Sequence, residues 1–207
     1  MNSLIIPFYH ITDELVEITK RCLNSLKYEP VDEVILVDDC SPIREDFPGY
    51  QVIRNLENRG YTHSVNRGLE AAQGDVLIVG NNDLIFTPGW LTSLREALEE
   101  HDIATLPTSD QTWETQDKIT KNDKFGSLFA MSRATYEKLG PLDERFRGYF
   151  VDTDFRRRAL NSGMTIGKNW NCLVEHEAKS TYSQVDGADE EFIRAKEIYK
   201  SKWGGLE

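Results

Sequence analysis

Short apolar runs alternate with segments of helical periodicity along the first half of the chain, and this alternation limits the folds open to it. The apolar runs are rich in branched aliphatic residues, as strands are, and they lie at 4–7, 33–37, 51–54, 75–79 and 103–106. The segments that place apolar residues on one helical face lie at 12–26, 62–72 and 88–98. Strands that alternate with helices form parallel sheets through right-handed crossovers. The sequence therefore predicts an α/β fold with a mostly parallel central sheet flanked by helices.

The second half of the chain begins with a polar stretch, 108–124, that is almost free of aliphatic residues. We expect a long mobile loop there, because long loops in compact domains usually have a function. A strand is predicted at 127–131, and helices are predicted at 133–139, 154–162 and 189–200. With 207 residues, the whole chain is expected to form one domain.

The chain is strongly acidic. Its 35 acidic and 24 basic residues give a net charge of −11, which repels nucleic acid and anionic lipid. A ligand that carries phosphates would therefore need a local device, such as a divalent cation, to be held. The sequence contains no apolar run of about 18 residues and no signal-peptide pattern, and its three cysteines suit a reducing compartment. We expect no nucleic-acid partner, no transmembrane segment and a cytoplasmic location.

Polar side chains with oxygen ligands cluster after the predicted strands. These clusters are Asp38–Asp39, Asn81–Asp83 and Asp152–Asp154, and in open parallel sheets ligands bind at this edge. Hard oxygen ligands hold Mg²⁺ or Mn²⁺ together with substrate phosphates. Glycosyl transfer from a nucleotide diphosphate needs such an ion at the leaving group and a separate carboxylate as base. The clusters can supply both groups.

Six motifs occur in the order in which a known family has them. They are Ile6–His10, Val37–Ser41, Asn58–Gly60 with its continuation to Asp75, Asn81–Asp83, Gly140–Phe146 and Tyr149–Asp154. Over residues 3–181 the chain resembles glycosyltransferase family 2, whose members have the Rossmann-like GT-A fold. The resemblance implies a nucleotide-sugar-binding half at 1–107 and an acceptor-binding, catalytic half at 108–207.

The resemblance also implies which residues hold the nucleotide. Pro7, Tyr9 and Asp39 would line the pocket for the base and ribose, with Asp39 accepting a hydrogen bond from one of them. Gly60 and Asn66 would let the backbone approach the nucleotide closely.

A second set of implied roles concerns the transfer itself. Asn82 would face the ribose or a phosphate, and Gly126 would leave room beside the donor sugar. Asp83 would bind the Mn²⁺ or Mg²⁺ ion that bridges the diphosphate, and His176 resembles a late histidine that joins the metal or diphosphate site in some members. Asp152 would be the general base of an inverting transfer.

The chain departs from the family pattern at two positions. Asn81 stands in place of the first aspartate of the DxD motif, which leaves Asp83 as its only charged ligand. Val151 stands where a glutamate commonly precedes the catalytic aspartate, so both Asp152 and Asp154 stay candidates for the base. The Gln-x-x-Arg-Trp motif of processive synthases is absent from the sequence, which favours the transfer of a single sugar.

The sequence thus favours a metal-dependent inverting glycosyltransferase that moves one sugar from a nucleotide-diphospho-sugar, preferably a UDP-sugar, to a saccharide or other hydroxyl acceptor. A sugar-phosphate nucleotidyltransferase is an alternative, although no glycine- and lysine-rich loop follows the first predicted strand. A non-catalytic module that binds nucleotide sugars is a further alternative. A dehydrogenase is disfavoured because no Gly-x-Gly-x-x-Gly follows that strand.

Overall fold

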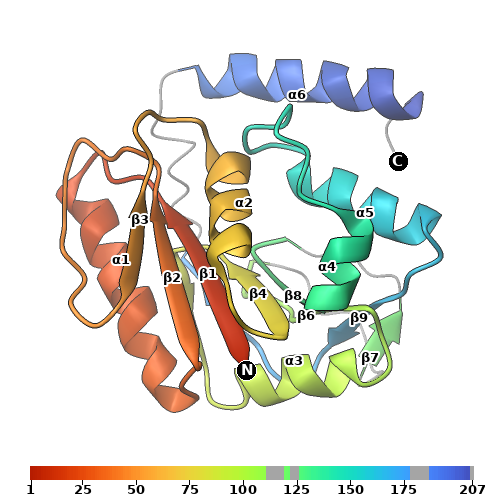
Figure 1. Cartoon of the computed structure of the whole chain (residues 1–207), viewed down its shortest axis with the longest axis horizontal. Coiled ribbons are helices and arrows are strands. Elements are labelled where there is room, and N and C mark those ends of the chain that lie inside the picture. The colour runs from red at the N-terminus through yellow and green to blue at the C-terminus, as the bar shows by residue number, and fades with distance from the viewer. Residues whose placement is uncertain (111–118, 122–125, 178–186, 206–207) are drawn as a thin grey trace.

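A computed structural model of the chain describes residues 1–110, 119–121, 126–177 and 187–205. Its main sheet has eight strands in the order β3-β2-β1-β4-β8-β6-β9-β7 (Figure 1). In sequence order these strands are β1 Asn2–Phe8, β2 Glu33–Asp38, β3 Gln51–Arg54, β4 Val76–Gly80, β6 Ile103–Thr105, β7 Ile119–Lys121, β8 Leu128–Ser132 and β9 Ile166–Asn169. A small antiparallel pair is formed by β5 Leu84–Ile85 and β10 Glu175–His176.

The sheet is mostly parallel, as predicted. Strands β3, β2, β1 and β4 are mutually parallel, and β6 pairs in parallel with β9. β8 runs antiparallel between β4 and β6. Its amino-terminal end therefore lies at the edge where the parallel strands end, and there the Asn81 amide donates to the Ser127 carbonyl over 2.9 Å.

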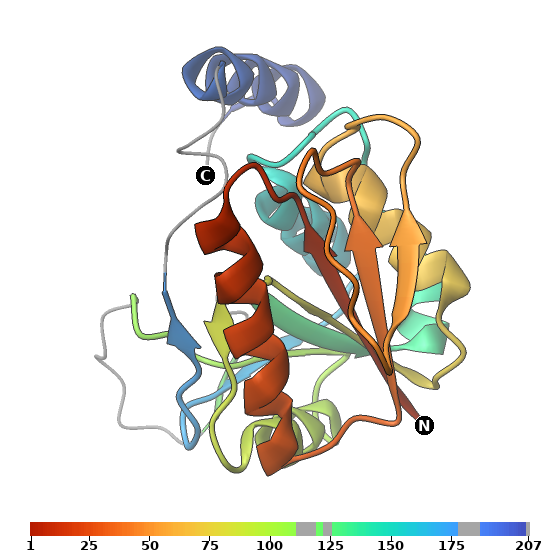
Figure 2. The same ribbon diagram turned by 90° about the vertical axis from the view of Figure 1, so that its left-hand side faces the viewer.

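Helices cover both faces of the sheet (Figures 1 and 2). One buried cluster joins α1 (Asp13–Ser25) and α3 (Trp90–Leu98) to alternate strand residues such as Leu4 and Ile6. The other joins α2 (Tyr61–Ala71) and α5 (Val151–Asn161) to residues such as Ile5, because successive strand side chains point to opposite faces. α4 (Arg133–Leu139) and α6 (Ala188–Trp203) pack against this second cluster.

Most predicted elements are confirmed, two of them with the predicted bounds, β3 at 51–54 and α4 at 133–139. α5 begins at Val151 rather than at 154, because Phe150 has a left-handed backbone (φ 62°) that turns the chain into the helix. Asp152 therefore lies in the first turn of α5.

Four strands were missing from the prediction. β5 and β10 have two residues each, too few to make a pattern. β9 carries Lys168 and Asn169, and both are buried although they are polar. β7 lies inside the predicted loop 108–124, and Thr108 at the start of that loop bridges to Val174. The prediction of one long loop is therefore wrong at these two places, and its segments 111–118 and 122–124 lie outside the described residues.

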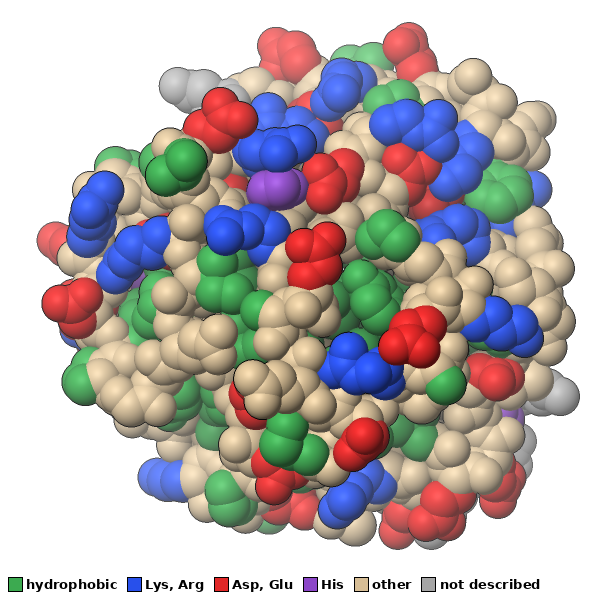
Figure 3. All heavy atoms as spheres, viewed as in Figure 1, with side chains coloured by type: hydrophobic (Ala, Val, Ile, Leu, Met, Phe, Trp, Pro, Cys, Tyr) green, Lys and Arg blue, Asp and Glu red, His purple; other side chains and the backbone are tan. Residues whose placement is uncertain are grey.

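No helix in the described ranges is both long enough and apolar enough to cross a bilayer. On the face seen in Figure 3, basic side chains are interspersed with acidic ones, so the net negative charge is not gathered into one acidic surface there.

Candidate functional site

A cleft of about 520 Å³ opens at the carboxyl ends of the parallel strands. The ends of β1, β2 and β4, the start of α2, β10 and the first turns of α6 contribute to its walls. Seven of the ten residues that the sequence assigned to a site line this cleft, namely Pro7, Tyr9, Asp39, Gly60, Asn82, Asp83 and His176. The topology therefore brings together residues from both halves of the chain.

Asp39 fixes the loop that leads into α2. Its carboxylate is buried, with 4% exposed, and Oδ1 accepts hydrogen bonds from Asn55 Nδ2 (2.7 Å) and from the Arg59 amide (3.0 Å). Oδ2 accepts from the Gly60 amide over 2.7 Å. A carboxylate offers about four acceptor positions, so Asp39 can hold this loop and still accept from a ligand in the cleft.

Gly60 is the position where this loop meets the segment before α5. Its backbone is left-handed at φ 92°, and a Cβ there would stand 2.8 Å from the Arg147 carbonyl oxygen. The Thr62 amide donates to that same oxygen over 3.1 Å, and Arg147 itself lines the cleft. Only glycine allows both the backbone conformation and the close approach.

Asp83 and His176 face each other because β5 and β10 pair next to them. His176 Nε2 lies 3.2 Å from Asp83 Oδ1, and Nδ1 lies 3.1 Å from Asp110 Oδ2. Burial opposes a charge on the ring, but the two carboxylates outweigh it and raise the pKa of His176 to about 9. The two carboxylates on either side of the ring therefore favour the protonated form of His176.

The chemistry of this pair fits a divalent cation. Asp83 is 6% exposed, and its Oδ1, which faces His176 in an ion pair, has no hydrogen-bond donor assigned among the described residues. Among the described residues, no three His, Cys, Asp or Glu side chains converge on one point. Mg²⁺ and Mn²⁺ do not require three, because one or two protein ligands and substrate phosphates complete their shell. Asp110 would then orient His176 from the far ring nitrogen, as carboxylates behind metal-bound histidines do.

Asn82 lines the cleft, but its amide nitrogen is engaged by α1. It donates to Thr19 Oγ1 over 2.8 Å, and the same oxygen is 2.9 Å from His10 Nε2. Thr19 in turn donates to the Leu15 carbonyl. The side chain of Asn82 is therefore held by a buried network that reaches back to the end of β1.

Asn66, Gly126 and Asp152 are not among the described residues that line the cleft. Asn66 is 3% exposed and exchanges two hydrogen bonds of 2.9 Å with the backbone of Leu142, so it ties α2 to the segment before α5. That Asn66 lets the backbone approach a nucleotide stays a prediction. Gly126 precedes Ser127, whose hydroxyl lies 3.4 Å from His176 Nε2, so it is one residue away from the site.

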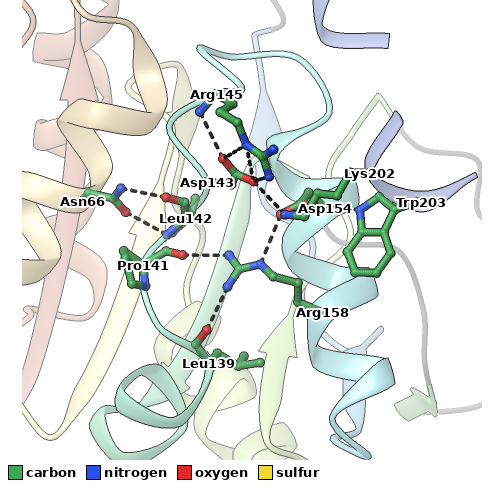
Figure 4. A network of polar contacts seen from close by, with 10 residues as sticks. All are labelled: Asn66, Leu139, Pro141, Leu142, Asp143, Arg145, Asp154, Arg158, Lys202 and Trp203. Atoms are coloured by element: carbon green, nitrogen blue, oxygen red, sulfur yellow. Dashed lines mark hydrogen bonds and ion pairs between the residues drawn. The ribbon is translucent and has the colours of Figure 1, made fainter. Parts of the chain in front are cut away.

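The two candidate bases differ sharply in their surroundings, and Figure 4 shows those of Asp154. Asp154 is 1% exposed and is held by Trp203 Nε1 at 2.8 Å, Lys202 Nζ at 2.7 Å and Arg158 Nε at 3.1 Å. These contacts make it a structural anchor. Asp152 is only half-buried in the first turn of α5 and is the better candidate for contact with a substrate.

The structure adds site residues that the sequence did not indicate. Asp110 belongs to the predicted loop, and nothing in its surroundings marked it as a partner of His176. Glu190, Glu191 and Arg194 line the cleft from α6, which was predicted only as a terminal helix. Their sequence is that of an ordinary exposed helix face, so it carried no signal.

A model described as glycosyl transferase family 2 matches residues 3–170, and the chain belongs to this family. It is 35% identical over 202 residues to a dolichol-phosphate mannosyltransferase of Pyrococcus furiosus, covering 88% of this chain and 54% of that protein. It is 24% identical over 169 residues to the uncharacterized glycosyltransferase YwdF of Bacillus subtilis, covering 77% of this chain and 59% of that protein. The chain thus spans little more than half the length of these relatives.

Two solved structures share the fold. GalNAc-T7, crystallised with UDP, GalNAc and Mn²⁺, has a TM-score of 0.73 at 14% identity, covering 99% of this chain and 50% of that one. Residues 1–349 of TarS from S. aureus have a TM-score of 0.66 at 15% identity, covering 97% of this chain and 73% of that one. These likenesses confirm the predicted GT-A fold.

Proposed function

We propose that this protein moves one sugar from a nucleotide-diphospho-sugar to an acceptor hydroxyl with the help of Mn²⁺ or Mg²⁺. The observation that carries the proposal is the buried Asp83, which faces His176 in the same cleft as Asp39 and whose Oδ1 has no hydrogen-bond donor in the described part of the chain. A net charge of −11 makes an anionic donor unfavourable unless a cation accompanies it. Family membership and the GT-A fold support the same reading of the cleft.

In this proposal the nucleoside lies against Pro7 and Tyr9, and Asp39 accepts one hydrogen bond from it. Asp83 and His176 are the residues that would hold the cation, which when bound would supply positive charge opposite the leaving diphosphate. A uridine nucleotide is the preferred donor, because GalNAc-T7 shares the fold and was crystallised with UDP.

Asp152 is the proposed general base. It takes the proton of the acceptor hydroxyl as that oxygen attacks the anomeric carbon from the face opposite the diphosphate, which inverts the configuration. Asp154 cannot take this role while it is enclosed by Lys202, Arg158 and Trp203. A donor-binding module without transfer is the second candidate, because Asp152 is not among the described residues that line the cleft.

Calorimetry and a transfer assay test the proposal. Wild type should bind a UDP-sugar much more tightly with Mn²⁺ than without it, and Asp83→Asn should lose this dependence. Asp46→Asn is the matched control, since Asp46 is fully exposed on the surface. Release of the nucleotide diphosphate in the presence of saccharide acceptors then separates an enzyme from a binding module. Metal-independent affinity for every nucleotide sugar tested would refute the proposal.

A further inference from the structure

The first turns of α6 form one wall of the cleft, although this helix lies beyond the residues that the family model matches. Figure 1 places α6 across the ends of the strands, next to α2 and α5. Gly187, Ala188, Glu190, Glu191 and Arg194 are its cleft-lining residues. In the proposed function the nucleotide lies against residues at the ends of β1 and β2 and at the start of α2. The α6 wall would then contact a group other than the nucleotide.

The packing of α6 holds this wall in place. Ala195 and Tyr199 are fully buried, and Lys202 bridges Asp143 and Asp154 with two contacts of 2.7 Å (Figure 4). The guanidinium carbon of Arg157 lies 4.9 Å from the ring centre of Trp203. Side chains on such an anchored helix keep a fixed geometry, as specific recognition requires.

The cleft end of α6 packs against the residues that lead into the proposed base. The Phe192 ring is 5.3 Å from that of Tyr149, edge to face, and 5.5 Å from that of Phe150. Phe150 has a left-handed backbone and directly precedes the helix that carries Asp152. The cleft end of α6 is therefore in contact with the two residues that lead into the helix carrying Asp152.

Glu191 has an unmet requirement for a hydrogen-bond donor. Its Oε2 pairs with Arg194 NH1 at 2.9 Å, and its side chain is only 18% exposed. Its Oε1 is buried, and the structure shows no donor for it within the described residues. A buried carboxylate oxygen without a donor is costly, and because Glu191 lines the cleft, a ligand bound there can supply the donor.

The charges of the wall define the class of ligand. α6 contributes two carboxylates, Glu190 and Glu191, and one guanidinium, Arg194, to the cleft. The positive charge is already compensated by its ion pair with Glu191, so the wall does not attract an anion. Carboxylates of this kind accept strong hydrogen bonds from hydroxyl groups.

We propose that α6 is the acceptor wall of the site, and that Glu191, held by Arg194, accepts a hydrogen bond from a hydroxyl group of an uncharged saccharide acceptor. This inference rests on the proposed transferase function. It excludes an acceptor that presents a phosphate to this wall, because Glu190 and Glu191 would repel it.

Initial rates with two acceptor panels test the inference, one of neutral methyl glycosides and one of the corresponding sugar phosphates. Glu191→Gln should raise the KM for the neutral acceptor about tenfold, as expected for the loss of one charge-assisted hydrogen bond. The donor affinity measured by calorimetry and the melting temperature should stay at wild-type values. Glu197→Gln on the exposed face of the same helix is the matched control and should change nothing.

Each other outcome overturns the inference. An unchanged acceptor KM in Glu191→Gln removes Glu191 from recognition, and a weakened donor affinity assigns its partner hydroxyl to the donor sugar. Wild-type preference for sugar phosphates refutes the uncharged acceptor. If wild type binds donor but transfers sugar to neither panel, the proposed transferase function itself is refuted. A wild type that transfers sugar, with a Glu191→Gln variant that has an unchanged KM, refutes only the role of Glu191.

Discussion

His176 Nε2 lies 3.2 Å from Asp83 Oδ1, and on its other side the same ring meets Asp110 at 3.1 Å. The three side chains form a row that begins at the end of the fourth strand of the sheet and ends at the first residues of the predicted loop. Because Asp110 lies against the second ring nitrogen of His176, we expect it to orient the histidine.

Asp110→Asn should therefore weaken Mn²⁺ binding about tenfold without abolishing it, as loss of a carboxylate behind a metal-bound histidine does. His176→Gln should weaken it more, because a direct ligand is lost. Titration of each variant with Mn²⁺ in the presence of UDP gives the affinities. Asp46→Asn serves as control, and equal affinities for Asp110→Asn and wild type would show that the contact has no role in metal binding.

Gly60→Ala should destabilise the protein more than Gly49→Ala does. Both glycines have φ near 90°, but a Cβ at Gly49 meets nothing within 4 Å, whereas a Cβ at Gly60 meets the Arg147 carbonyl oxygen at 2.8 Å. We expect about 1 kcal/mol for the backbone strain at Gly49 and about 1–3 kcal/mol more at Gly60. Urea denaturation gives both free energies of unfolding, and similar losses would mean that the clash is relieved by local movement.

Asp154→Asn and Asp152→Asn should separate stability from catalysis. The Asp154 variant leaves Lys202 and Arg158 without their buried partner and should lose about 3 kcal/mol of stability. The Asp152 variant should keep wild-type stability and donor affinity but lose kcat by a factor of about 10²–10⁴, as expected for a general base. Thermal unfolding and single-turnover rates measure the two effects. A stable, inactive Asp154→Asn would reverse the assignment.

Stability should fall in mild acid because of His10. Burial lowers the pKa of His10 from 6.5 to about 4, so the folded protein keeps the ring neutral where the unfolded chain protonates it. Above pH 6.5 the ring is neutral in both states and costs no stability. As the pH falls from 6.5 towards 4, the unfolded chain binds a proton that the folded protein does not, so the free energy of unfolding decreases progressively. His10→Gln should therefore make the free energy of unfolding less dependent on pH in this window. The difference in bound protons between the unfolded and folded states, which sets the slope, should fall by up to about one. Identical slopes would show that the fold does not lower the pKa of His10.

Much of the fold followed from the sequence because its elements carry strong local patterns. β1, β2 and β4 each contain an uninterrupted apolar run of at least four residues, and α4 starts after a Ser132 cap and ends before Gly140. β5, β9 and β10 were missed for the opposite reason, since they are short or polar and exist only through their neighbours.

The candidate site divides in the same way. Asp39 and Asp83 were found because each follows a strand directly, where parallel topology places ligands. Glu191 and Asp110 were not found, since only tertiary packing brings Glu191 to the cleft and Asp110 to His176. Asn66 resembled a nucleotide contact, but the fold uses its amide to hold Leu142.

The order of strands in the sheet has a kinetic consequence. β4 lies beside β8, and β5 lies beside β10, so both pairings join segments that are remote in the sequence. Contacts of this kind form slowly, because a long stretch of chain must be closed before they stabilise anything. The cleft is complete only after both have formed, so recovery of nucleotide binding during refolding should report the arrival of the last native contacts rather than the first collapse.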